Sequence, residues 1–214
     1  MIQHQDPKIA NTQLRLTLLG MQQVLGEQST QEIIGNLDFE SELAELPPED
    51  LELRFAAQDY AQLLAAVERS YANQGARILT RIGRATFHQV LREQPNWMSS
   101  AHSAMGVLKA KQRIVLILEA IIDAELQIYP QGESWIEQRN GQISIIEQNC
   151  LVCCGRQESS PTCYLRSGYL NEAVRWAVEV EYQFQETACI AMGDPYCRFS
   201  IDTSHSRSRA STSR

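Results

Sequence analysis

The hydrophobic period of this chain changes close to Pro130, and no other feature constrains the fold as strongly. Before this point apolar residues recur at helical spacing, most clearly over residues 107–126. After it, apolar and polar residues alternate on both sides of Asn140-Gly141, a dipeptide typical of tight hairpins. Helices that precede strands, instead of alternating with them, predict an α+β fold with the helices packed on one antiparallel sheet.

The same patterns predict where the elements lie. Helical spacing is found over Leu14–Leu25 up to Gly26, Leu63–Tyr71, Ile78–Leu91 up to Pro95, Val107–Leu126 and Cys163–Glu179, with a further short helix capped by Ser29 or Thr30. Strands are expected around Ile136 and Ile143, over Val180–Gln185 and over Cys197–Asp202, and loops over residues 38–53 and 150–162. We interpret residues 1–202 as a single domain, with a helical part over 1–130 and a second part over 131–202, followed by a disordered tail over 203–214.

The composition excludes several classes of protein. The formal net charge is -7, so we expect no general nucleic-acid-binding surface. The most apolar run is interrupted by Glu119 and Asp123 and falls short of the roughly 18 apolar residues of a membrane span. Residues 1–7 carry no Lys or Arg, so no secretory signal is expected. We therefore expect a cytoplasmic protein whose six cysteines are reduced, either as thiols or as metal ligands.

Four residues near the C-terminus form a candidate metal site: Cys163, Glu186, Cys189 and Cys197. Strand alternation places Glu186 on the inward side, where an ionised carboxylate is costly unless it is paired or metal-bound. Residues three apart on a regular strand face opposite sides, so Glu186 and Cys189 need a bulge or bend between them to meet one metal. The alternative is that these cysteines are small buried hydrophobic residues.

A second group of cysteines leaves its role open. Cys150 and Cys153 form a C-x-x-C that is followed by Cys154. Three roles are open for this group. It supplies two ligands of a different metal site with Cys163 as the third, it forms a redox pair, or its members are ordinary loop cysteines. The four histidines, at positions 4, 88, 102 and 205, have no metal-ligand spacing.

Three segments of the C-terminal half resemble the 4-vinyl reductase domain family: Asn149–Cys153, Cys163–Tyr169 and Glu186–Phe199. The family includes stand-alone bacterial and archaeal proteins, the hydrocarbon-sensor domains of phenol- and xylene-responsive activators, and a 4-vinyl reductase-type protein of bacteriochlorophyll synthesis. The resemblance implies a fold like that of TRAPP trafficking subunits and nitric-oxide sensor domains. No ATPase or helix-turn-helix region follows, so we expect a stand-alone member.

The resemblance also implies a metal and a set of ligands. In the phenol-sensor branch zinc is bound by a Cys followed by E-x-x-C-x7-C, and Cys163, Glu186, Cys189 and Cys197 reproduce this spacing. We therefore expect one structural zinc held by these four residues, and no catalytic residue. Relatives pair through helices, and the stripe Leu14–Leu25 has no obvious partner in the C-terminal half of the chain, so a homodimer is expected.

Three functions fit these features. The first is a zinc-stabilised sensor or carrier of a small hydrophobic molecule, with its pocket beside the 107–126 helix and Leu118 as a probe of that pocket. The alternative is a tetrapyrrole (chlorophyll or bacteriochlorophyll) biosynthesis or photosystem assembly factor, in which Arg77, Arg81 and Arg84 meet a propionate. The third is a dimeric scaffold. No nucleotide or flavin fingerprint is present, so we expect that the protein is not an enzyme. If it is one, we expect a vinyl-tetrapyrrole reductase or an accessory of that reductase.

Overall fold

The computed structural model describes residues 7–43, 45–93 and 105–203. The predicted tail therefore lies outside the described residues from position 204 on. The helices are α1 (Asn11–Leu25), α2 (Glu27–Ile34), α3 (Ala57–Ser70), α4 (Gly75–Glu93), α6 (Ala110–Ile128) and α7 (Tyr164–Val178), with short 3-10 turns over Glu40–Leu43, Ala72–Gln74 and Ile190–Met192. The strands are β1 (Lys8–Ala10), β2 (Leu53–Ala56), β3 (Glu133–Arg139), β4 (Gln142–Gln148), β5 (Gln185–Ala188) and β6 (Cys197–Asp202).

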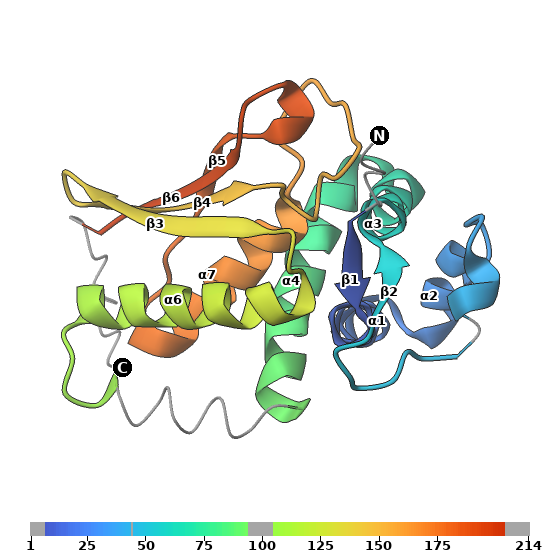
Figure 1. Ribbon diagram of the computed structural model, residues 1–214, viewed down its shortest axis with the longest axis horizontal. Helices are drawn as coiled ribbons and strands as arrows, with labels where there is room; N and C mark the ends of the chain where they lie inside the picture. Colours follow the sequence, from blue (N-terminus) through green and yellow to red (C-terminus); the bar gives the residue numbers. More distant parts are fainter. Residues whose placement is uncertain (1–6, 44, 94–104, 204–214) are drawn as a thin grey trace, which may run out of the picture.

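The main sheet has four strands in the order β3-β4-β6-β5, and each neighbouring pair is antiparallel. Asn140 and Gly141, both at positive φ, form the turn between β3 and β4, as the Asn-Gly signal predicts. Ile143 and Ile145 of β4 face Ile201 and Phe199 of β6 and are fully buried. Figure 1 shows this sheet lying over α6 and α7, with α1, α2, α3 and the small β1-β2 sheet on the far side of α4. The predicted α+β architecture is confirmed.

Helix α1 is buried within the chain. Leu14, Leu18 and Met21 are at most 2% exposed and belong to the main core, and α1 packs against α4 and α2. The partner of this stripe is α4, which lies in the N-terminal half like α1, so the lack of a partner in the C-terminal half gives no reason to expect a dimer through α1. The homodimer stays a prediction, but it needs another surface.

Three details of the predicted elements differ. Helix α2 begins at Glu27, directly after Gly26, whose φ of 84° separates it from α1, so neither Ser29 nor Thr30 caps it. Residues 179–184 form no strand; Tyr182 and Phe184 are buried in an irregular segment. This segment is held there by the Phe184 backbone N–H, which donates to Asn171 Oδ1 at 2.7 Å. Strands β1 and β2 have three and four residues, too few to show a period in the sequence.

Two glycines let α4 and α7 approach closely. A Cβ at Gly83 would lie 2.0 Å from the Leu165 carbonyl oxygen, and one at Gly168 would lie 2.1 Å from the Thr80 carbonyl oxygen. The two helices therefore meet backbone to backbone, which fixes α7 and the loop before it against the N-terminal half. No helix in the described ranges is long and apolar enough to cross a membrane.

We expect Gly83→Ala to lower the free energy of unfolding by about 1 to 3 kcal/mol, because the added methyl must push two helix backbones apart. Gly35→Ala is the matched control: its Cβ would find no atom closer than 3.4 Å, and its φ of -62° suits alanine. Urea unfolding of both variants measures the difference. Equal stabilities would mean that the helices separate without cost.

Candidate functional site

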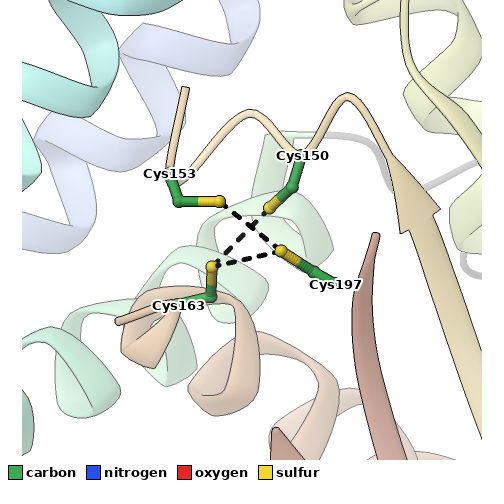
Figure 2. Close-up of side chains that lie close together, drawn as sticks. All are labelled: Cys150, Cys153, Cys163 and Cys197. Atoms are coloured by element: carbon green, nitrogen blue, oxygen red, sulfur yellow. Dashed lines mark hydrogen bonds between the residues drawn. The ribbon is translucent and has the colours of Figure 1, made fainter. Parts of the chain in front are cut away.

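Six potential metal ligands gather at the start of α7. Cys163 is the residue just before α7, Cys197 is the first residue of β6, and Cys189 follows β5. Cys150 and Cys153 lie in the loop after β4, and Glu186 lies in β5. Figure 2 shows the sulfurs of Cys150, Cys153, Cys163 and Cys197 pointing toward one another from three separate segments.

The sulfur–sulfur distances match those of a tetrahedral metal site. Sγ atoms lie 3.7 Å apart for Cys150 and Cys163, 3.4 Å for Cys153 and Cys197, and 3.9 Å for Cys163 and Cys197. With metal–sulfur bonds of about 2.3 Å, a tetrahedron has edges of about 3.8 Å. The four sulfurs are buried and within 4.8 Å of one another, so this cluster could hold a metal ion.

Glu186 and Cys189 join Cys163 and Cys197 in a second group that satisfies the same 4.8 Å distance. The register between β5 and β6 shifts between Glu186 and Ala188, which is the bulge that the strand-parity argument requires. Glu186 Oε2 accepts the Cys163 backbone N–H at 2.9 Å, whereas Oε1 is buried and has no partner within the described chain. Burial raises the pKa of Glu186 to about 8, because no cation in the described chain compensates the ionised carboxylate.

The thiols influence one another's ionisation. The Cys153 thiol lowers the pKa of Cys150 and of Cys189, whereas the Cys150 thiol raises the pKa of Cys163 and of Cys197.

The structure brings the predicted ligands Cys163, Glu186, Cys189 and Cys197 together, and it adds Cys150 and Cys153 to the same cluster. Sequence reasoning left these two open because a loop has no period from which to place them. Cys154 belongs to neither group. His88 bonds Glu172 at 2.8 Å, away from the cluster, and the other three histidines lie outside the described residues.

A cavity of about 420 Å³ lies next to the cysteine cluster, lined by residues of α1, α3, α4, α6, α7 and the end of β4. Its walls include the apolar side chains of Leu16, Val90, Ile121 and Ile122, and Cys150 lies both in this wall and in the cluster. The predicted pocket beside the 107–126 helix is thus present, but Leu118 is fully buried in the core and does not line it. The stripe was too broad for sequence reasoning to tell the core-facing residues from the cavity-facing ones.

Arg166 of α7 is a buried cation in the cavity wall. Its Nε donates to Glu147 of β4, and its Nη1 and Nη2 donate to the two carboxylate oxygens of Glu125 of α6. One guanidinium neutralises one of the two carboxylates, and burial raises the pKa of Glu147 well above its usual value. Sequence reasoning missed this residue, although it lies in the Cys163–Tyr169 segment that carries the resemblance.

Three tyrosines contribute to the polar part of the wall: Tyr60 and Tyr129, which are buried, and Tyr169, which is half-buried. Tyr60 Oη lies 2.9 Å from Thr17 Oγ1 and accepts a hydrogen bond from Gln13 Nε2 at 3.0 Å. Burial raises the pKa of Tyr60 and of Tyr169, so both phenols keep their protons at neutral pH. Arg77, Arg81 and Arg84 are not among the lining residues, and Arg84 pairs with Glu172 and Glu181.

Comparisons with known proteins support both the family and the fold. Residues 143–203 match the model of the 4-vinyl reductase domain, which covers the sheet from β4 on, α7 and both ligand groups. A search of the curated proteins found no match.

The solved structures that the fold resembles are H-NOX domains. A variant of the H-NOX protein from K. algicida in the unliganded Fe(II) state has a TM-score of 0.61 and 13% identity, over 92% of this chain and 97% of that one. An H-NOX protein from S. oneidensis in the Fe(II)NO state has 0.60 and 12%, over 89% and 99%. An oxygen-binding H-NOX domain related to soluble guanylate cyclases has 0.58 and 10%, over 92% and 96%. At these identities the comparison establishes the fold alone, and it confirms the nitric-oxide-sensor-like architecture.

Proposed function

We propose that this chain, whose residues 143–203 match the 4-vinyl reductase domain and whose fold is H-NOX-like, is a zinc-stabilised sensor or carrier of a small hydrophobic molecule. The observation that supports this proposal best is the cavity of about 420 Å³, which is in the size range of small-molecule sites. It lies at the junction of the helical half and the 4-vinyl reductase domain, so an occupant contacts both.

The chemistry of the wall suggests the class of ligand. Most of the wall is apolar, and the one buried guanidinium is already paired with Glu125 and Glu147. Two carboxyls against one cation disfavour an anionic ligand. We therefore propose a neutral, largely apolar molecule with one hydrogen-bonding group that contacts Tyr169 or the ion-paired Arg166. A tetrapyrrole propionate gains nothing from Arg77, Arg81 or Arg84, since none of them lines the cavity.

The residues of the cavity do not fit a haem, the group named for some of the H-NOX structures. Haem iron needs an axial His, Met, thiolate or phenolate. The lining residues, all within the described part of the chain, include no His or Met. The Cys150 sulfur belongs to the cysteine cluster, and burial raises the pKa of all three lining tyrosines, so their phenols hold their protons. We propose no haem chemistry for this protein.

The metal part of the proposal is a structural zinc in the cysteine cluster. Thiolates with one carboxylate suit zinc, and four protein ligands leave no position for a reactive water. A closed site of this kind contributes to folding and does not catalyse a reaction. All six cysteines lie in the described part of the chain and none is in a disulfide, which suits the cytoplasm. We also propose that the protein does not reduce its ligand unaided.

The direct test is to purify the protein from its native host and to analyse it by mass spectrometry and visible spectroscopy. A co-purified apolar small molecule supports the sensor or carrier function, and a pigment absorption band identifies the tetrapyrrole alternative instead. Steady NADPH-dependent turnover of a vinyl tetrapyrrole by the pure protein would overturn the non-enzymatic assignment. Protein that carries no ligand and binds none from a host extract contradicts the proposal.

We expect Ile122→Trp to abolish binding of the co-purified molecule, because a larger side chain in the wall fills the cavity. Ile122 is only half-buried, so the fold should tolerate the change. Val115→Trp on the same helix is the matched control: Val115 is half-buried as well but lies outside the cavity. Isothermal titration of both variants gives the comparison. Equal binding by the two would place the ligand elsewhere.

A further inference from the structure

The six potential ligands at the start of α7 are two more than one tetrahedral ion takes. They form two groups of four that overlap. Cys150 and Cys153 belong only to the first group, Glu186 and Cys189 belong only to the second, and Cys163 and Cys197 belong to both. A pair of sulfurs shared in this way is the common edge of two tetrahedra.

The first group has the geometry of a complete site without Glu186. Its three measured sulfur–sulfur distances, 3.4, 3.7 and 3.9 Å, bracket the tetrahedral edge of about 3.8 Å. All four of its cysteines are buried, and their sulfurs point to one centre (Figure 2).

The second group carries an independent sign of a missing cation. Glu186 Oε1 is buried and unpartnered within the described chain, and such an oxygen is costly to leave without a charge or donor. An ion coordinated by the first group alone leaves this oxygen unpaired. The Cys163 and Cys189 sulfurs lie 4.0 Å apart, and together with Glu186 and Cys197 they form the second group.

We propose that the protein holds a two-metal cluster in which the thiolates of Cys163 and Cys197 bridge two zinc ions. Cys150 and Cys153 complete the coordination of one ion, and Glu186 and Cys189 complete that of the other. Five thiolates and one carboxylate carry six negative charges, of which two Zn²⁺ neutralise four. The remaining charge equals that of one Zn²⁺ in four thiolates, so the second ion adds no uncompensated charge. This inference rests on the metal part of the proposed function and is independent of the cavity's ligand.

The metal content of the full chain tests the cluster. We expect about two zinc ions per chain by native mass spectrometry and elemental analysis. After exchange with cadmium, NMR should give two metal resonances that are coupled to each other through the shared sulfurs. One zinc per chain, or two uncoupled resonances, overturns the shared cluster and leaves the proposed function in place. No zinc at all overturns the metal part of that function as well.

Substitutions assign the two ions. The double variant Cys150→Ser, Cys153→Ser should hold one zinc, and so should Cys189→Ser. Cys154→Ser is the matched control, because Cys154 is next to Cys153 but belongs to neither group, and it should hold two. If either variant of the unshared ligands still holds two ions, the assignment is wrong. If a variant does not fold, the coupled cadmium resonances of the unaltered protein decide.

Discussion

Cys163→Ser is expected to lower the free energy of unfolding by about 4 kcal/mol or more, which places it among the largest effects of a single substitution. Cys163 is fully buried and belongs to both ligand groups, so its loss disrupts every metal arrangement that the cluster allows. For a chain of this size each kcal/mol corresponds to roughly 2 to 4 °C in melting temperature. Calorimetry should therefore show a fall of roughly 8 to 16 °C.

Chelation provides the second half of this test. The unaltered protein, treated with a strong chelator, should melt close to the Cys163→Ser variant, and the chelator should have little further effect on that variant. Cys154→Ser, the control from the same loop, should melt like the unaltered protein. A Cys163→Ser variant that keeps both its melting temperature and its zinc would show that the metal does not stabilise the fold.

Arg166→Met is expected to lower the free energy of unfolding by about 3 to 5 kcal/mol, the usual cost of removing one partner from a buried ion pair. Methionine fills a similar volume, so the loss is mainly electrostatic. The Glu147 side chain, 8% exposed, loses its guanidinium and becomes an unpaired carboxyl in the core. Arg175→Met is the matched control on the same helix, because Arg175 is 46% exposed and its partner Glu172 keeps its contacts with Arg84 and His88.

The cost of Arg166→Met should depend on pH. Burial raises the pKa of Glu147, and without Arg166 nothing opposes this shift. A carboxyl whose pKa is higher in the folded state than in the unfolded state contributes stability at low pH and loses it as the pH rises through the folded pKa. The variant should therefore be closest to the unaltered protein at low pH and fall further behind as the pH rises. A pH-independent difference would mean that Glu147 finds another partner.

The elements that could be predicted from sequence are those with a long period. The helices α1, α4, α6 and α7 extend over roughly four to five turns, and the β3-β4 hairpin carries both alternation and an Asn-Gly turn. The strand predicted over residues 180–185 failed for a definite reason. Its alternation reflects burial of Tyr182 and Phe184 beneath α7, which an irregular segment achieves without strand pairing.

The site was predictable only in part. The spacing of Glu186, Cys189 and Cys197 identified one group of ligands, and the required bulge is where the parity of the strand places it. Cys150 and Cys153 reach the same centre because positive φ angles at Asn149 and Gly155 turn the loop after β4, which no period reveals. Arg166 looks like any helical arginine in the sequence. Only the packing of α7 between α6 and β4 shows that it is buried with two carboxyls.

All the candidate metal ligands lie between Cys150 and Cys197, whereas α4, against which α7 packs, is translated long before them. The helical half of a nascent chain therefore stays uncovered until α7 has left the ribosome. The cysteines made first have no complete metal site until Cys197 has been synthesised. In the finished protein these thiols are buried, so the period of synthesis is when cellular oxidants reach them. Oxidative damage to this protein should thus follow its rate of production and not its age.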